Sequence, residues 1–330
     1  MIELFGLRLK RSVLGAVTAV SLACGGLAQA EEWPDDNIRL VVPYSAGGTT
    51  DLLSRKVADL LQRELSTVVV ENRPGAGSTV ATGQLARGGR GSDHMLLMAP
   101  PGHTIGASLY PNLRYDPVAD FAFIRNVINI PNVMVVPASS PYNTVAEFVE
   151  AAREQQLSFS SPGIGSSIHM SGELFKNLTK TQLVHVPFRG SGEALPALLA
   201  GDVDVAFENM PTVYPHIQSG KLKALAVTTP QESEFLPGVP TMQQAGAGYG
   251  LEDYETSAWF GLIAHKSFPE SGLEKLELAL EKIMSGDDFQ NFLPQFGAVA
   301  GEEVGEDFRA MVKSELAKWS EVAEQANLKR

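Results

Sequence analysis

The fold is decided by the stretch VVPYSAGGTTD, residues 41–51, where an apolar run meets a glycine-rich turn and then a helix. The apolar run predicts a buried strand, and Thr49 or Thr50 can cap a helix that begins near Asp51. Glycine lets the backbone approach a ligand, and a helix start presents N–H groups without internal partners. The turn is therefore either a site for an anion or only a tight reversal of the chain.

A second turn of the same kind lies at SFSSPGIGSSIHMSGELF, residues 158–175. Here a strand is followed by Pro162-Gly163-Ile164-Gly165, and Ser166 or Ser167 caps the next helix. Two helix starts facing one cleft could hold a small anion between them. Each end contributes about 0.3 to 1 kcal/mol, and each hydrogen bond to a charged group about 1.5 to 3 kcal/mol. Four or five such contacts would give micromolar binding, which needs about 8 kcal/mol, without any arginine.

Working outward, short apolar runs alternate with amphipathic stretches, which is typical of α/β folds built on mostly parallel sheets. Helices are predicted at Asp51 to Leu65 and Glu306 to Gln325, where apolar side chains recur at helical spacing. The predicted strands are Ile38 to Val42, Val68 to Glu71, Met95 to Met98, Val133 to Val136, Leu157 to Ser160, Leu183 to Val186, Val203 to Phe207, Ala224 to Thr228 and Trp259 to Ala264.

The chain also shows two places where it could cross between halves of the molecule. One is Ile130-Pro131-Asn132, and the other is the Pro/Gly-rich stretch that follows Thr229. We expect a first domain made of residues 31–130 and 231–330, with a second domain, 131–230, inserted into it. Such an insertion leaves a cleft, with the crossing strands as hinges.

The amino terminus reads as a secretory signal over residues 1–30. Arg8, Lys10 and Arg11 precede the apolar run Val13 to Ala23, and Ala28-Gln29-Ala30 forms a small-residue cleavage site. An uncleaved anchor is one alternative, and lipid attachment at Cys24, the only cysteine, is another. Cleavage would leave 23 cations and 37 anions, a net charge of −14 compared with −12 for the 330-residue chain. This acidity argues against nucleic acid, and the lack of further cysteines excludes disulfides.

Enzyme and metal sites find little support in the motifs. The glycine pairs complete neither a phosphate loop nor a dinucleotide fingerprint. Ser166 or Ser167 with His169 lacks the Gly-x-Ser-x-Gly elbow of hydrolases, and the six histidines show no metal-binding spacing. We therefore expect no catalytic residues, no metal and no cofactor. His169 is either a hydrogen-bonding residue of the helix start or a ligand contact.

Seven segments, in order, resemble one family, the Bug-type extracytoplasmic solute receptors, which are the binding proteins of tripartite tricarboxylate transporters. The segments are VVPYSAGGTTD (from Val41), VVVENRPGAGS (from Val68), SSPGIGSSIHMSGELF (from Ser160), HVPFRGSGEALPALLAGDVDVAFEN (from His185), KLKALAVTT (from Lys221), LPGVPTMQQAG (from Leu236) and WFGLIA (from Trp259). The similarity runs from about Trp33 to the carboxyl terminus.

The resemblance implies a two-domain periplasmic binding protein of the Venus-flytrap kind, type II-like, acting as a monomer in the periplasm. It implies capture of a di- or tricarboxylate or an aromatic acid, and delivery to a permease of one large and one small subunit. The ligand-binding residues carried over are Tyr44, Ser45, Ala46, Gly47, Gly48, Thr49, Asp51, Gly163, Gly165, Ser166, Ser167, His169, Phe188, Arg189, Gly190, Glu208 and Asn209. The alternatives are an enzyme of small acids and a receptor that feeds a sensor kinase.

Some positions depart from the family pattern or stay ambiguous. Pro100 to His103 and Gly88 to Asp93 are unusual for the family, and both could touch the cleft entrance. Arg189 either pairs with a second carboxylate of the ligand or lies on the surface. Trp259 and Phe260 are expected in the core rather than against the ligand.

Overall fold

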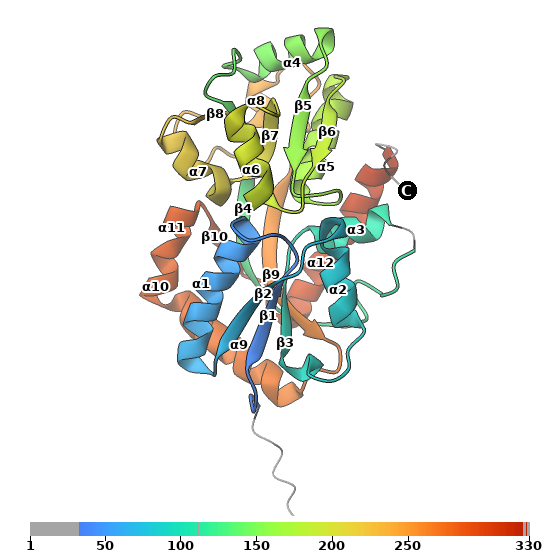
Figure 1. The fold of residues 1–330 in the computed structure, drawn as a ribbon, viewed down its shortest axis with the longest axis vertical. Coiled ribbons are helices and arrows are strands. Elements are labelled where there is room, and N and C mark those ends of the chain that lie inside the picture. The colour runs from blue at the N-terminus through green and yellow to red at the C-terminus, as the bar shows by residue number, and fades with distance from the viewer. Residues whose placement is uncertain (1–32, 111, 326–327, 329–330) are drawn as a thin grey trace, which may run out of the picture.

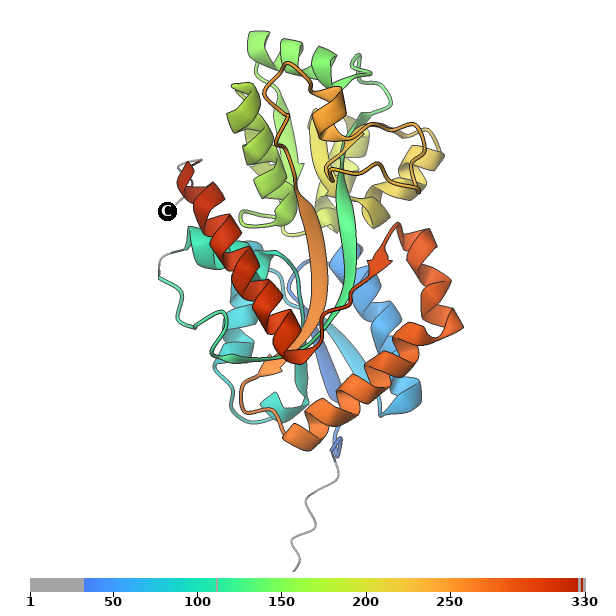
Figure 2. The same cartoon turned by 180° about the vertical axis from the view of Figure 1, so that it is seen from behind.

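The structure, a computed structural model, describes residues 33–330 except 111, 326–327 and 329–330. The signal segment predicted for residues 1–30, together with Cys24, lies outside the described residues. Two lobes stand one above the other and share two long strands (Figures 1 and 2). The described helices include none with the length and apolar content that crossing a membrane requires.

The first lobe is built on strands β1 (Ile38–Val42), β2 (Val68–Asn72), β3 (Met95–Ala99) and β10 (Val299–Ala300). The second is built on β5 (Ser158–Ser161), β6 (Val184–Pro187), β7 (Val205–Asn209) and β8 (Leu222–Val227). The shared strands are β4 (Phe121–Pro137) and β9 (Ser257–His265). The continuous order is β2-β1-β3-β9-β4-β7-β5-β6, with β8 and β10 also paired to β4.

The predicted α/β class is confirmed, but the sheet is mixed rather than mostly parallel. Strands β1, β2 and β3 pair in parallel, as do β5, β6 and β7. The shared strands β4 and β9 instead run antiparallel to their neighbours. Strands β4 and β9 each run from one lobe into the other, and this crossing sets their direction relative to the neighbouring strands.

The predicted crossing at residues 130–132 lies inside β4. Pairing with β9 extends to Pro131, and pairing with β7 begins at Asn132. Hydrogen bonds link this junction to neighbouring segments of the chain. The Asn132 N–H donates to Thr228 Oγ1 at 3.1 Å, and the Asn132 side chain donates to Ser171 Oγ at 2.9 Å. All three residues are fully buried, so the crossing point is a polar network sealed inside apolar packing.

Helices cover both faces of the sheet in each lobe, as Figure 1 shows. The first lobe carries α1 (Thr49–Glu64), η1 (Ala76–Ser78), α2 (Thr79–Ala86), η2 (Ser92–His94), α3 (Gly102–Leu109), α9 (Glu270–Ser285), α10 (Asp287–Gln290), α11 (Phe292–Phe296) and α12 (Gly305–Gln325). The second carries α4 (Val145–Glu154), α5 (Ser167–Thr179), α6 (Ser191–Ala200), α7 (Met210–Gln218) and α8 (Met242–Ala245).

Each lobe has its own apolar core. In the first lobe, Leu40, Leu96 and Leu262 belong to one of the buried clusters. In the second lobe, Phe148, Phe159 and Phe207 belong to another. The segment after β8 packs with the second lobe, since Leu236 joins one of its clusters and Met242 and Tyr254 join the other. The chain therefore stays with the second lobe until it enters β9.

Candidate ligand site between the lobes

A small cavity of about 20 Å³ lies between the lobes, enough for roughly one water-sized group. Helix starts from both lobes surround it. Its lining residues are Tyr44, Gly48, Thr49, Thr50, Asp51, Pro100, Pro101, Pro162, Ser166, Ser167, Ile168, Ser191, Asn209 and Phe260. They belong to the starts of α1, α3, α5, α6 and α7 and the turns that lead into them, together with β9. A larger ligand can enter only if the lobes separate.

The lobes touch closely around the cavity. Thr49 Oγ1 of α1 lies 2.9 Å from Thr212 Oγ1 of α7, and the Ser45 N–H donates to the Arg189 carbonyl at 3.2 Å. A Cβ added to Gly48 would lie 3.3 Å from Ser191 Cβ. The conformation is therefore the closed one, with α1 of the first lobe facing α6 and α7 of the second.

The helix starts supply positive dipole ends and N–H donors to this cavity. Ser166 caps α5 by accepting from the His169 N–H at 3.1 Å, which leaves Ser167 and Ile168 in the first turn, where the backbone has no acceptor four residues back. Thr49 and Thr50 stand in the same position on α1, after Gly48. Among the described residues that line the cavity there is no Lys, Arg or His. The chemistry offered is thus that of backbone donors and hydroxyls, which suits an anion.

Two carboxyl groups stand beside the cavity in different states. Burial acts to raise the pKa of Asp51, but hydrogen bonds from Arg55, the Gly47 N–H and Asn72 outweigh it and hold the pKa below its usual value. Asp51 therefore stays ionised, and its carboxylate accepts hydrogen bonds within the turn instead of binding the ligand.

The other carboxyl belongs to Glu208, at the end of β7. Burial raises the pKa of Glu208 to about 7, although hydrogen bonds from the Asn209 N–H and the Ser191 hydroxyl favour the ionised form. Ser191 and Asn209 both line the cavity, so Glu208 lies directly behind its wall. Burial also raises the pKa of Tyr44, with the nearby Tyr110 and Glu208 adding to the effect.

The structure brings together eight of the predicted site residues at the cavity itself: Tyr44, Gly48, Thr49, Asp51, Ser166, Ser167 and Asn209 in its lining, and Glu208 behind Asn209 and Ser191. Six others border it through the turns. Ser45, Ala46, Gly47 and Gly190 lie where α1 and α6 meet, and Gly163 and Gly165 lie in the turn before α5.

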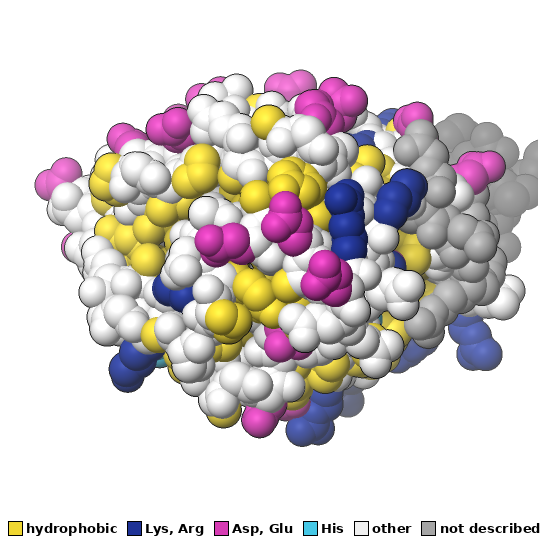
Figure 3. Space-filling model, turned by 90° about the horizontal axis from the view of Figure 1, so that it is seen from above, with side chains coloured by type: hydrophobic (Ala, Val, Ile, Leu, Met, Phe, Trp, Pro, Cys, Tyr) yellow, Lys and Arg dark blue, Asp and Glu magenta, His cyan; other side chains and the backbone are white. Residues whose placement is uncertain are grey.

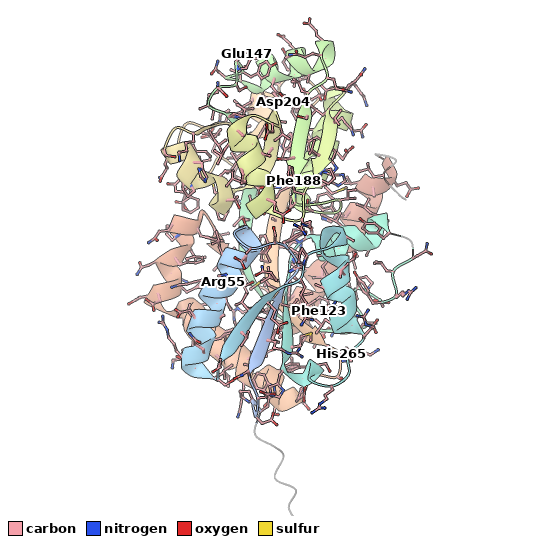
Figure 4. The ribbon with its side chains drawn as sticks, in the orientation of Figure 1. Arg55, Phe123, Glu147, Phe188, Asp204 and His265 are labelled. Carbon is pink, nitrogen blue, oxygen red and sulfur yellow. The ribbon has the colours of Figure 1, made fainter. Side chains whose placement is uncertain are left out.

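The remaining three predicted residues do not line the cavity. His169 accepts from the Gly165 N–H at 3.3 Å and lines a separate cavity of about 350 Å³ with Glu173 and His185. Arg189 is exposed in the turn before α6 and pairs with Glu193 of that helix at 3.2 Å. Phe188 is half-buried at the edge of the second lobe that faces the first (Figure 4).

The list of site residues predicted from the sequence does not contain several lining residues, namely Thr50, Pro100, Pro101, Pro162, Ile168, Ser191 and Phe260, although the segment from Pro100 to His103 was expected at the cleft entrance. Ser191 could have been predicted from the sequence, because Gly190-Ser191-Gly192 repeats the pattern of a small-residue turn between a strand and a helix start. Of the two unusual segments, Pro100 and Pro101 line the cavity, whereas Gly88 approaches His265 at the far end of the first lobe (Figure 4). Phe260 is both a core residue, 2% exposed, and part of the lining.

Comparison with known proteins agrees with this arrangement. Protein BugT of Bordetella pertussis is 29% identical over 95% of this chain and 97% of its own. The structure of the periplasmic binding protein BugD superposes with a TM-score of 0.85 at 31% identity, covering 90% of this chain and 99% of that one. Rpa4515 of R. palustris, solved with adipate, superposes with a TM-score of 0.84 at 31% identity, covering 89% and 98%.

The family match extends through both lobes. Residues 53–328 match the family described as the tripartite tricarboxylate transporter family receptor, which covers every helix and strand after the first turn of α1. Together with a fold built from two lobes that close on an anion-suited cavity, this match makes the chain a member of the tripartite tricarboxylate transporter receptor family.

Proposed function

We propose that this protein is a periplasmic, non-catalytic receptor that captures a small organic carboxylate between its lobes and passes it to a membrane permease of one large and one small subunit. The observation that carries the proposal is the convergence of helix starts from both lobes on a cavity whose described lining holds no basic side chain. Backbone N–H groups there would bind the carboxylate, and binding from both sides would favour closure. Rpa4515, which shares the fold, was solved with adipate.

We assign the carboxylate contacts chiefly to Thr49, Ser167, Ser191 and Asn209, with Tyr44 and Gly48 beside them. The predicted contacts through Ala46, His169 and Arg189 receive less support, because these side chains or turns lie away from the lining. The protein would act as a monomer, since the proposed site is complete within one chain.

The domain division is part of the same proposal. The predicted domains are 31–130 with 231–330, and the insertion 131–230. The packing of Leu236, Met242 and Tyr254 with the second lobe supports a return crossing at the start of β9, residue 257, in place of residue 231. Strands β4 and β9 would then be the two hinge strands.

The test measures binding to the mature protein by thermal shift and calorimetry, using a series of carboxylates and the matching uncharged amides. Carboxylates are expected to raise the melting temperature and amides are not, because only an anion interacts with the dipole ends. Mass spectrometry of the recovered acid is expected to show no turnover. A protein stabilised by other ligand classes but by no carboxylate would refute the proposal.

A variant tests the backbone donors directly. Ser167 is the first residue of α5, a position where proline fits the helix but removes the N–H. Ser167→Pro is expected to weaken carboxylate binding by roughly tenfold or more. Ser167→Ala separates the loss of the hydroxyl from the loss of the N–H. Glu270→Pro, at the exposed first position of α9 after an extended Pro269, is the matched control that should bind normally.

A further inference from the structure

Asn209 is the point at which the ligand cavity meets the buried polar network of the crossing. It lies at the end of β7, lines the cavity and is 5% exposed. Its side-chain nitrogen Nδ2 donates to Asn132 Oδ1 at 2.5 Å. Asn132 lies opposite it on β4, is fully buried and is not among the described residues that line the cavity. The hydrogen bond therefore joins a residue that faces the ligand to one that does not.

The orientation of the Asn132 side chain is fixed by the residues behind it. Its Nδ2 donates to Ser171 Oγ of α5 at 2.9 Å, and Ser171 Oγ lies 2.7 Å from Thr256 Oγ1. With its nitrogen held by Ser171, Asn132 turns its oxygen toward Asn209. A reversed Asn132 amide would bring its nitrogen against the Asn209 nitrogen, and two buried donors would then face each other without an acceptor, which costs free energy. Asn132 thus presents an acceptor to Asn209.

An acceptor at this point decides which polar atom Asn209 offers to a ligand. The nitrogen of a carboxamide carries two hydrogens, and Asn132 accepts one of them from Asn209. The second hydrogen is left for a ligand. If Asn132 did not hold that nitrogen, the Asn209 amide could rotate and present its carbonyl oxygen, which repels a carboxylate. A donor that is already oriented also avoids the entropic cost of ordering it on binding.

Building on the proposed function, we propose that Asn132 is a positioning residue of the carboxylate site, which holds the Asn209 amide with an N–H available to the ligand. Asn132 also connects this donor to both strands that cross between the lobes. It lies on β4 itself, and its backbone N–H donates to Thr228 Oγ1. The Thr228 hydroxyl in turn donates to the carbonyl of Thr256, the residue before β9, at 2.7 Å. The ligand donor is therefore held in place relative to the hinge strands.

The test is a double-mutant cycle on carboxylate affinity, measured by calorimetry. The probe is adipate, malate, citrate or benzoate, whichever of the four binds the wild type most tightly. Asn132→Ala is expected to weaken binding about tenfold or more, the loss that one hydrogen bond to a charged group produces. In an Asn209→Ala background the same change should cause no further loss, because the group through which Asn132 acts is gone.

A role of Asn132 in folding alone would weaken binding equally in both backgrounds. That result, or wild-type affinity in a folded Asn132→Ala protein, would overturn the inference and leave the proposed function intact. If none of the four probes binds the wild type, the proposed function and the inference fail together.

Two further variants complete the cycle. Ser171→Ala removes the acceptor behind Asn132 with a small change of volume, and it keeps the test decisive if Asn132→Ala does not fold. It should weaken binding at least threefold, but not in the Asn209→Ala background, and wild-type affinity in this variant would contradict the inference. Asn126→Ala is the matched control, since Asn126 is equally buried on β4 but donates to Glu303 of the first lobe at 2.8 Å. It should lower the melting temperature and keep the wild-type affinity.

Discussion

At the scale of single residues, Glu208 is the group beside the site whose charge changes near neutral pH. The unfolded chain ionises it near 4.5, whereas burial raises the folded pKa to about 7. Between these values the folded state holds more protons than the unfolded state, so the free energy of unfolding falls as pH rises from about 4.5 to about 7. Above pH 7 the ionised carboxylate would also repel an anionic ligand across Ser191 and Asn209.

Glu208→Gln is therefore expected to remove both effects. Wild-type affinity for a carboxylate should fall about tenfold between pH 6 and pH 8, since only about a tenth of Glu208 stays protonated one pH unit above its pKa. The variant, whose amide can still accept from Ser191 and Asn209, should bind almost equally at both pH values. Calorimetry at the two pH values measures this. Glu147→Gln, an exposed change at the outer end of the second lobe (Figure 4), should keep the wild-type profile.

The role of a residue could be predicted where neighbouring residues in the sequence decide it, as in a helix cap. It could not be predicted where packing against a distant segment decides it. The cap at Ser166 follows from the sequence Gly-Ser-Ser before an amphipathic run, and the structure contains it. The position of His169 does not follow, because its ring packs at a tilt against His185, 4.3 Å away between ring centroids, in a different cavity. Nothing within residues 158–175 specifies that neighbour, which comes from another strand.

At the scale of elements, glycines set how closely the helix starts of the two lobes approach. Gly192 in the first turn of α6 has no positive φ, and alanine favours helices more than glycine does by about 1 kcal/mol. Its Cβ, however, would lie 2.0 Å from the Ala46 carbonyl oxygen of the other lobe. Gly192→Ala should keep the melting temperature of the free protein at or above that of the wild type while blocking closure.

Carboxylate affinity of Gly192→Ala is then expected to fall by about a hundredfold or more, because contacts from two lobes can no longer form together. Gly83→Ala is the matched control, a helical glycine of α2 whose added Cβ would meet Tyr115 at an ordinary 3.5 Å. Calorimetry and thermal unfolding of both variants distinguish a closure defect from a folding defect. Normal affinity in Gly192→Ala would mean that the ligand does not require this contact.

The strand elements show a similar limit to sequence reasoning. Most predicted strands agree with the structure within two residues, because their apolar runs are short and bounded by turns. The first part of β4, residues 121–132, was missed, since Arg125, Asn126 and Pro131 interrupt the apolar pattern. Pro131 is tolerated there because it lies where the strand changes partner from β9 to β7. In the sequence alone, a proline at such a crossing therefore indicates the end of a strand.

At the scale of the whole molecule, the net charge of −12 gives no attraction for an anionic ligand. Figure 3, which views the outer end of the second lobe, shows acidic side chains with some basic ones among apolar and polar groups. Charges beyond a Debye length of about 8 Å are largely screened at physiological ionic strength. Affinity must then come from the donors within the closed cavity, and closure itself must be favourable enough to form it.

The contact that most directly couples the lobes away from the ligand is an apolar cluster beside α12. It joins Ile105 and Leu109 of α3 and Trp319 of α12 to Met170 of α5 in the second lobe. Leu109 Cδ1 lies 3.8 Å from the place of a Cβ on Gly165, so Leu109 touches the second lobe directly. In Figure 2, α12 rises from the first lobe toward the second on this side. The cluster would stabilise the closed state before any ligand binds.

Leu109→Ala is expected to shift the lobes toward the open state, because part of the lost apolar contact, worth about 2 to 5 kcal/mol in a packed core, is made with Met170 of the second lobe and exists only in the closed state. Carboxylate affinity should fall tenfold or more, and small-angle scattering should show a larger radius of gyration for the free protein. Leu85→Ala is the control, since Leu85 is equally buried but lies in a cluster of the first lobe alone. It should lower the melting temperature without changing affinity. If both variants lose stability equally and keep wild-type affinity, the cluster is part of the core and does not bias closure.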